Sequence, residues 1–145
     1  DRMCMTFGGR AAENIVFGKI STGAQNDLDQ VTKMAYSMVA VFGMNDKVGQ
    51  VSFYGMQNEQ FHKPYSDETA GMIDEEVRKL VDSQYERAQI LLKEKREELE
   101  ILANALLEKE VILKSDVERL IGARPADLKE KAKQNGSVEE EKKEA

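Results

Sequence analysis

This sequence has few of the residues that build disulfides and zinc sites. It contains one cysteine, Cys4, and one histidine, His62, among 145 residues. A single cysteine cannot form an internal disulfide, which fits a reducing compartment. One cysteine and one histidine also fall short of the three or four protein ligands that zinc requires. A Cys/His zinc site supplied by this chain alone is therefore excluded.

The sequence also lacks a long hydrophobic run and an isolated basic cluster. No apolar segment approaches the roughly 20 residues of a transmembrane helix, and the opening residues do not resemble a signal peptide. We therefore expect a soluble chain. The formal net charge is −6, and the basic residues are interspersed with acids. Binding to nucleic-acid phosphates depends on clustered cations, so the sequence argues against a nucleic-acid partner.

The composition that remains is typical of a folded helical protein. Hydrophobic residues make up 41% of the chain and charged residues 33%, which is ordinary for one domain with a modest core. Apolar residues recur at helical spacing over most of the sequence. We predict an all-α fold, a helical bundle, in which the one candidate extended segment is Val51–Tyr54. His62 follows in a polar stretch that predicts a surface loop.

The first predicted helix spans Asp1–Phe17 and ends at Gly18. A stripe of apolar residues at four-residue steps marks its buried face. The stripe consists of Met3, Phe7, Ala11 and Ile15. The pair Gly8-Gly9 weakens a helix, so a close approach of another backbone is a plausible reason for it. Glycines inside a helical stripe do not form a phosphate-binding loop, which must precede a helix.

A second helix begins within Ser21–Asp27 and runs to about Phe42, before Gly43. Thr22 and Gln25 have the spacing of a capping box, in which each side chain satisfies a free backbone N–H. On a helical wheel Asp27 falls in the middle of the apolar face. That face consists of Val31, Met34, Met38, Val41 and Phe42, whereas Asp29, Thr32, Lys33 and Tyr36 fall on the opposite, solvent side.

An inward carboxylate at Asp27 needs a partner, because burying an unpaired charge costs several kcal/mol. An arginine or a set of backbone N–H groups is one solution, and a metal ion is another. The periodicity of the helix does not choose between these alternatives.

The remaining half of the chain predicts further helices. Ser66 is a natural N-cap for a long helical run that continues to about Leu106, either as one helix or as two with a break within the charged stretch 93–98. Ser115 and Glu118 form a second capping box, and the short helix that they open ends at Gly122. We divide the chain into a folded part, residues 1–124, and a charged tail, residues 125–145, that is expected to be disordered.

Five segments carry a resemblance to a known family. They are Phe7–Glu13, Ser21–Asp27, Phe42–Met44, Tyr65–Thr69 and Leu106–Glu110. In this order and at matching separations the first four resemble the peptidase domain of FtsH-type membrane-bound AAA proteases, which are ATP-dependent zinc metalloproteases, and the fifth also fits. The resemblance covers about residues 1–124.

The resemblance implies a specific role for Asp27. In the family, zinc is held by the two histidines of a His-Glu-x-x-His helix and by an aspartate further along, and Asp27 matches that aspartate. The implied chemistry is metal-assisted peptide hydrolysis, with the motif glutamate as general base. This sequence contains no His-Glu-x-x-His, since His62 is its only histidine. We therefore expect the motif upstream, no catalytic residue in this chain, and no peptidase activity or tight zinc binding by the chain alone.

The same resemblance implies the wider setting. The intact protein would bind Zn²⁺ in this domain and ATP with Mg²⁺ in an upstream module, degrade polypeptide substrates and assemble as a homo-hexamer. It would be anchored by upstream helices in the bacterial cytoplasmic membrane, with this domain on the cytoplasmic side, or alternatively in the mitochondrial inner membrane. The alternative function is a non-catalytic helical oligomerisation or interaction module.

Overall fold

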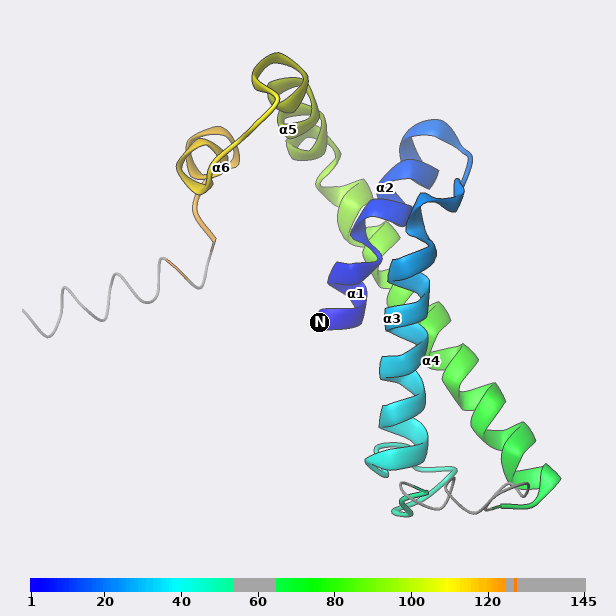
Figure 1. Ribbon diagram of the computed structural model, residues 1–145. Helices are drawn as coiled ribbons and strands as arrows, with labels where there is room; N and C mark the ends of the chain where they lie inside the picture. The colour runs from blue at the N-terminus through cyan, green and yellow to red at the C-terminus, as the bar shows by residue number, and fades with distance from the viewer. Residues whose placement is uncertain (54–64, 125–126, 128–145) are drawn as a thin grey trace, which may run out of the picture. The chain divides into compact units, whose positions relative to one another are not determined.

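The computed structural model describes residues 1–53, 65–124 and Asp127 (Figure 1). Every regular element within these residues is helical, which confirms the all-α prediction. The chain divides into two compact units, Asp1–Glu94 and Lys95–Ala145. None of the described helices is both long and apolar enough to cross a membrane. The predicted loop around His62 and nearly all of the predicted tail lie outside the described residues.

Two helices stand where the sequence predicted one. Helix α1 (Arg2–Thr6) and helix α2 (Gly8–Phe17) are separated at Phe7, where φ is −75° and ψ is −6°. The predicted end at Gly18 is confirmed, with a left-handed φ of 63° that favours glycine. The expected reason for Gly8-Gly9 is wrong. A Cβ atom added at either position would meet no other described atom within 4 Å.

The predicted second helix begins through a different cap. One 3₁₀ turn, η1 (Thr22–Ala24), precedes helix α3 (Gln25–Tyr36). The Ser21 hydroxyl accepts a hydrogen bond of 3.2 Å from the Gly23 N–H, and no side chain caps α3 itself. The Thr22–Gln25 capping box is therefore wrong, because the tighter turn places a serine one residue earlier at the cap.

A turn of π-helix, η2 (Ser37–Val41), extends α3. The Phe42 N–H donates to the Ser37 carbonyl oxygen five residues earlier, at 2.9 Å. The Ser37 hydroxyl donates to the Lys33 carbonyl oxygen at 2.9 Å, a local bond that often distorts helices. The helical stretch ends at Phe42, as predicted, and Gly43 adopts a φ of 61°.

Helix α4 (Asp67–Glu94) follows the loop region. The predicted Ser66 cap is confirmed, since its hydroxyl accepts the Thr69 N–H at 3.2 Å. The candidate extended segment is not a strand over its described part, Val51–Phe53, and Tyr54 lies outside the described residues.

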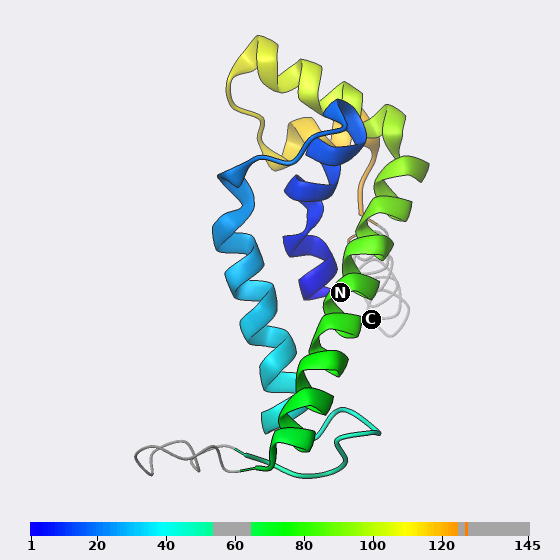
Figure 2. The same cartoon turned by 90° about the vertical axis from the view of Figure 1, so that its right-hand side faces the viewer.

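The core of the first unit lies where α1, α2, α3 and α4 meet. Figure 2 shows α1 between α3 and α4, in agreement with its contacts to both helices. Phe7 contacts Tyr85 edge to face, with ring centroids 5.3 Å apart. The buried core consists of Met3, Cys4, Phe7, Ala11, Val31, Ala35, Val39, Ile73, Val77 and Ala88. Ile15, the fourth member of the predicted first stripe, is only half-buried.

The second unit contains helix α5 (Arg96–Lys109) and helix α6 (Lys114–Ile121). Of the two alternatives for the long helical run, one helix or two, the structure shows two, because α4 ends at Glu94 and α5 begins at Arg96. The predicted Ser115–Glu118 box is wrong. Instead the Asp116 carboxylate accepts the Leu113 N–H at 3.2 Å, and the cap lies at Leu113, two residues before Ser115. Gly122 ends α6, as predicted, with a φ of 88°.

Candidate metal ligand and the groove beside it

Asp27 lies in the first turn of α3 and is half-buried. The η1 turn before it is held by hydrogen bonds of Ser21 and by burial of Ala24. Ser21 caps η1, and its own N–H donates to the Glu13 carboxylate of α2 at 3.1 Å. This hydrogen bonding by Ser21 is the main cause that lowers the pKa of Glu13. Ala24 is buried beneath the turn. The backbone that presents Asp27 is therefore held by both the cap and the core.

The Asp27 carboxylate makes no hydrogen bond or ion pair with any residue of the described part of the chain. Neither an arginine nor a set of backbone N–H groups from these residues satisfies it. Partial exposure to water explains how an unpaired carboxylate is tolerated there. The sequence prediction of a carboxylate in the middle of a buried face is therefore wrong in degree, because Asp27 lies at the edge of the core.

The predicted apolar stripe of this helix becomes more exposed toward its C-terminal end. Val31 is fully buried, Met34 and Met38 are half-buried, and Phe42 is 65% exposed. The π turn contributes to this outcome, because it shifts the helical register between Met38 and Phe42. Val31 is the buried member of the predicted stripe, and the other buried positions of α3 and η2 are Ala35 and Val39.

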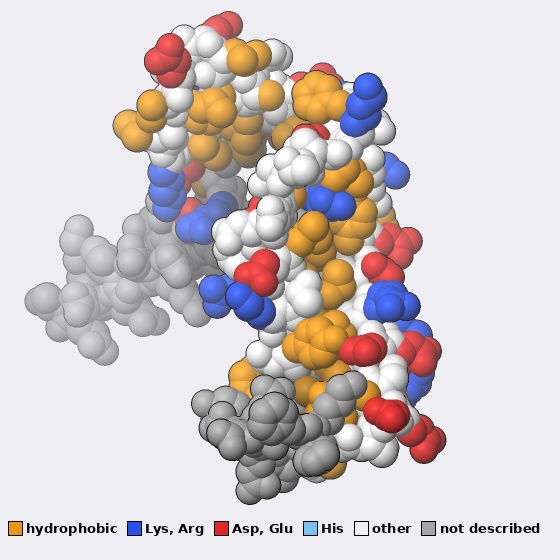
Figure 3. All heavy atoms as spheres, turned by 45° about the vertical axis from the view of Figure 1, so that its right-hand side comes forward, with side chains coloured by type: hydrophobic (Ala, Val, Ile, Leu, Met, Phe, Trp, Pro, Cys, Tyr) orange, Lys and Arg blue, Asp and Glu red, His pale blue; other side chains and the backbone are white. Residues whose placement is uncertain are grey.

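The opposite side of α3 faces solvent, as predicted. Tyr36 is exposed, and its hydroxyl donates to the Asp74 carboxylate of α4 at 2.5 Å. This hydrogen bond is the main cause that raises the pKa of Tyr36. On the face drawn in Figure 3, acidic and basic side chains lie interleaved beside hydrophobic surface. Surface ion pairs such as Lys33–Asp29 (2.6 Å) follow from this mixture.

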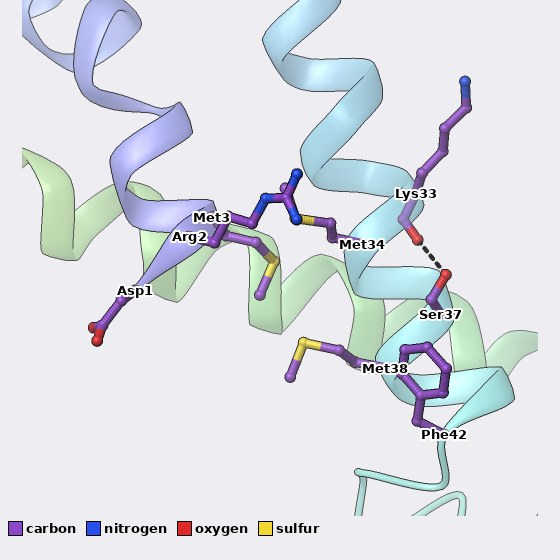
Figure 4. Close-up of a pocket in the computed structure, with 8 residues that line it drawn as sticks. All are labelled: Asp1, Arg2, Met3, Lys33, Met34, Ser37, Met38 and Phe42. Carbon is purple, nitrogen blue, oxygen red and sulfur yellow. Dashed lines mark hydrogen bonds between the residues drawn. The ribbon is translucent and has the colours of Figure 1, made fainter.

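A groove of about 490 Å³ opens between α1 and the α3–η2 helix. In Figure 4 the side chains of Met3, Met34 and Met38 extend toward one another across it, while Lys33 extends away. Phe42 closes one end. Met34 is seven residues, or about 10 Å along the axis, from Asp27 on the same face of the helix. The lining residues are Asp1, Arg2, Met3, Lys33, Met34, Ser37, Met38 and Phe42.

A second hollow, of about 310 Å³, is also lined by Phe42 but shares no other residue with the groove. Its walls come from the end of η2 and from the returning segment Gln50–Ser52. Phe42 therefore stands between two hollows with most of its ring exposed. The helical pattern predicted Phe42 on the apolar face but gives no sign of either hollow, since both depend on how distant segments meet.

The described residues supply one zinc ligand rather than a set. They contain no group of three or more His, Cys, Asp or Glu side chains that could hold a metal ion. His62 lies outside the described residues. Asp27 fits the chemistry of a zinc ligand, because its carboxylate is half-buried and unpaired within the described chain. The remaining ligands would have to come from elsewhere.

A polar network at the other end of α3 was missed by the sequence analysis. The Glu76 carboxylate of α4 accepts hydrogen bonds from Asn45 (3.0 Å), Lys47 (2.8 Å) and Lys79 (3.2 Å). The helical pattern of α4 does not distinguish Glu76 from the other charged positions of the helix. Only the path of the loop after Gly43, which a sequence pattern does not specify, brings Asn45 and Lys47 to it.

Comparison with known proteins places the whole folded part in one family. Residues 1–120 match peptidase family M41. The chain is 56% identical over 129 residues to the ATP-dependent zinc metalloprotease FtsH of Rhodothermus marinus, a match that covers 86% of this chain and 18% of the relative. It is 54% identical over 127 residues to the mitochondrial inner membrane m-AAA protease component AFG3L2 of Mus musculus, covering 86% and 16%.

A plant relative gives a similar result. The chain is 51% identical over 125 residues to the mitochondrial ATP-dependent zinc metalloprotease FTSH 10 of Arabidopsis thaliana, covering 86% of this chain and 15% of the relative. The chain thus spans less than a fifth of the length of these relatives. The family match extends over most of the chain and agrees with the motifs around Gly8-Gly9 and Asp27. This chain belongs to peptidase family M41.

Proposed function

We propose that this chain is part of an ATP-dependent zinc metalloprotease and supplies Asp27 as the third protein ligand of its zinc ion. The observation that carries the proposal is the half-buried Asp27 carboxylate, which has no partner in the described chain. Its motif matches the family's ligand aspartate, and relatives at 51–56% identity are named zinc metalloproteases. The two histidine ligands and the general base would come from a segment upstream of the matched region.

When bound, zinc would polarise the scissile carbonyl and lower the pKa of its water. The residues of this chain would orient one side of the site. Asp27 would contribute a negative charge, and its place in the first turn of α3 suits a carboxylate because of the helix dipole. The Ser21 and Glu13 contacts would keep that turn in place. The groove along Met34 and Met38, on the same helical face, would lie beside the site.

The wider activity follows as part of the same proposal. The parent protein would hydrolyse polypeptide substrates, use ATP and Mg²⁺ bound by an upstream module, and assemble as a homo-hexamer. It would be held in a membrane by helices outside this chain. The bacterial cytoplasmic membrane and the mitochondrial inner membrane are the two locations, since relatives of both origins match the chain at similar identity.

The test replaces Asp27 in the full-length protein. Asp27→Asn keeps the size of the side chain but removes the charge that favours Zn²⁺, so we expect the loss of bound zinc and at least a 100-fold loss of proteolysis, with ATPase activity retained. The matched control is Asp29→Asn. Asp29 is exposed on the opposite face of α3 and pairs only with Lys33 among the described residues, so this variant should keep zinc and proteolysis.

The 145-residue chain alone gives the complementary measurement. One carboxylate cannot supply a catalytic zinc site, so zinc content after dialysis should be negligible and casein hydrolysis absent. A stable Asp27→Asn protease with full zinc content would contradict the ligand assignment. Zinc-dependent hydrolysis by the isolated chain would contradict the claim that the other ligands lie elsewhere.

A second candidate function, a helical interaction module, is favoured by the second unit. Neither α5 nor α6 contains a buried residue. Leu107 is 82% exposed, and Val111 and Leu113 are about two-thirds exposed. Apolar side chains left in water in this number are typical of a surface that binds another protein. In this alternative the chain contributes assembly contacts and no zinc ligand, so Asp27→Asn would leave proteolysis unchanged.

A further inference from the structure

The segment Gly43–Phe53 forms a closed loop that returns to the helix it leaves. The Met44 N–H donates to the Met38 carbonyl oxygen at 2.9 Å, and the Phe53 N–H donates to the Ala40 carbonyl oxygen at 2.8 Å. Gly43 allows the close return, because a Cβ atom there would lie 3.2 Å from the Gln50 Cα and its φ is 61°. Both ends of the loop are therefore hydrogen-bonded to carbonyl groups of the π turn.

Helix α4 holds this loop through one carboxylate. The Glu76 side chain is only 11% exposed, and it accepts the Asn45 Nδ2 at 3.0 Å and the Lys47 Nζ at 2.8 Å. Lys79, one turn later on α4, donates to the same carboxylate at 3.2 Å. Hydrogen bonds to a charged acceptor of low exposure are among the stronger ones in proteins.

Asn45 couples this carboxylate to the loop backbone. While its amide nitrogen donates to Glu76, its Oδ1 accepts the N–H groups of Lys47 and Val48, both at 3.0 Å. Val48 and Phe53 pack against the core of the first unit. Phe53 also contacts Tyr65 edge to face, with ring centroids 4.8 Å apart. The loop is thus held at its start by a polar contact and at its end by an aromatic one.

Phe42 depends on this arrangement for its place. It lies directly before the loop, 65% exposed, and lines both hollows. Since few contacts of its own hold an exposed ring, the backbone on either side must fix it. That backbone is the π turn on one side and the loop anchored by Glu76 on the other.

We propose that Glu76 is a positioning residue for the groove: it lines neither hollow, but by holding the loop through Asn45 it fixes Phe42 between them. The proposal rests on the loop contacts and is independent of the metal role of Asp27.

The test uses the absence of tryptophan from the chain. Phe42→Trp introduces a single indole, whose fluorescence anisotropy and acrylamide quenching report on position 42. In this background Glu76→Gln should lower the anisotropy and increase quenching about twofold. It should also speed hydrogen exchange of the Lys47 and Val48 amides at least tenfold, since Asn45 loses its charged partner. The matched control is Glu75→Gln on the neighbouring residue, which is exposed and pairs with Lys79.

A second variant covers the case in which Glu76→Gln loosens α4 itself, as seen by circular dichroism. Asn45→Asp keeps the oxygen that accepts the two loop amides but replaces the donor to Glu76 with a second negative charge. It should reproduce the anisotropy loss while α4 stays intact. The proposal is overturned if Asn45→Asp, or a fully helical Glu76→Gln variant, matches the Glu75→Gln control in both anisotropy and quenching.

Discussion

The two units of this chain are stabilised in different ways, although their sequences share the same helical periodicity. Asp1–Glu94 buries ten apolar side chains in a common core. In Lys95–Ala145, neither α5 nor α6 buries a side chain, and ion pairs lie around the start of α6. Lys109 and Arg119 pair with Asp116, at 3.0 and 3.1 Å. Regular apolar spacing thus predicts a helix but not whether the same unit covers its apolar face.

Asp127 of the second unit is buried, unlike every residue of α5 and α6. It is 8% exposed and accepts two hydrogen bonds from Arg124, at 3.1 and 2.8 Å. Lys114 lies 3.1 Å from the same carboxylate. These cations, Arg124 foremost, lower the pKa of Asp127. Among the described residues of this unit, the buried one is therefore held by charged side chains that are themselves exposed.

The largest predicted effect comes from the core of the first unit. Phe7 is 2% exposed and contacts Tyr85, so Phe7→Ala should lower the free energy of unfolding by about 3–5 kcal/mol. Urea denaturation of the 145-residue chain, followed by circular dichroism, measures this. Phe17→Ala is the control, because Phe17 is 72% exposed. Equal denaturation midpoints for the two variants would show that Phe7 does not belong to the core.

A smaller effect is expected from low pH, and each unit contains a carboxylate that reports on it. Hydrogen bonds from Lys47 and Asn45 lower the pKa of Glu76 from 4.5 to about 2. Because the folded state favours the charged form, its contribution is complete above pH 4.5 and is lost as the pH falls through about 2. The loop should therefore stay anchored at pH 3.5. An NMR titration of the Glu76 carboxyl carbon measures this, and a midpoint near 4.5 would contradict the anchor.

Asp116 of the second unit provides the comparison in the same titration. Its pKa is also lowered, first by Lys109 and then by the Leu113 N–H. Its contribution to the start of α6 should likewise be present above its ordinary pKa and be lost at lower pH.

The smallest predicted effect belongs to the exposed face of the second unit. Leu107 is 82% exposed, so Leu107→Ala should change the free energy of unfolding by no more than about 0.5 kcal/mol. The same denaturation experiment measures it. A loss of several kcal/mol would mean that this side chain is covered in solution, and that the contrast between the units is weaker than their burial indicates.

The helices of this chain could be predicted from sequence because local signals fix them. A helix-ending glycine or a capping serine affects the backbone at its own position. Four boundaries therefore lie where they were predicted, at Gly18, Gly43, Ser66 and Gly122. Caps were less predictable. Ser21 and Asp116 replaced the expected residues because a 3₁₀ turn and an earlier start displaced the caps by one or more positions.

The site could be predicted only in part. The motif around Asp27 identified the family and a candidate ligand. The degree to which the Asp27 side chain is buried depends on which side of α3 the other helices cover. The groove and the Glu76 network depend on contacts between residues about 30 positions apart. The Ser37 hydroxyl was the one local sign of the π turn, since a serine within a helix can bond to the preceding turn.

The π turn has a consequence for sequence change in this helix. A π turn is equivalent to an α-helix into which one residue has been inserted. Deleting a single residue between Ser37 and Val41 would close the turn into an ordinary helix and leave the direction of the residues after it nearly unchanged, because the π turn already spreads its extra residue over one wider turn. A deletion within α3 would instead rotate everything after it by about 100° relative to Asp27. The π turn is therefore the place in this helical stretch where a change of length by one residue disturbs Phe42 and the loop least.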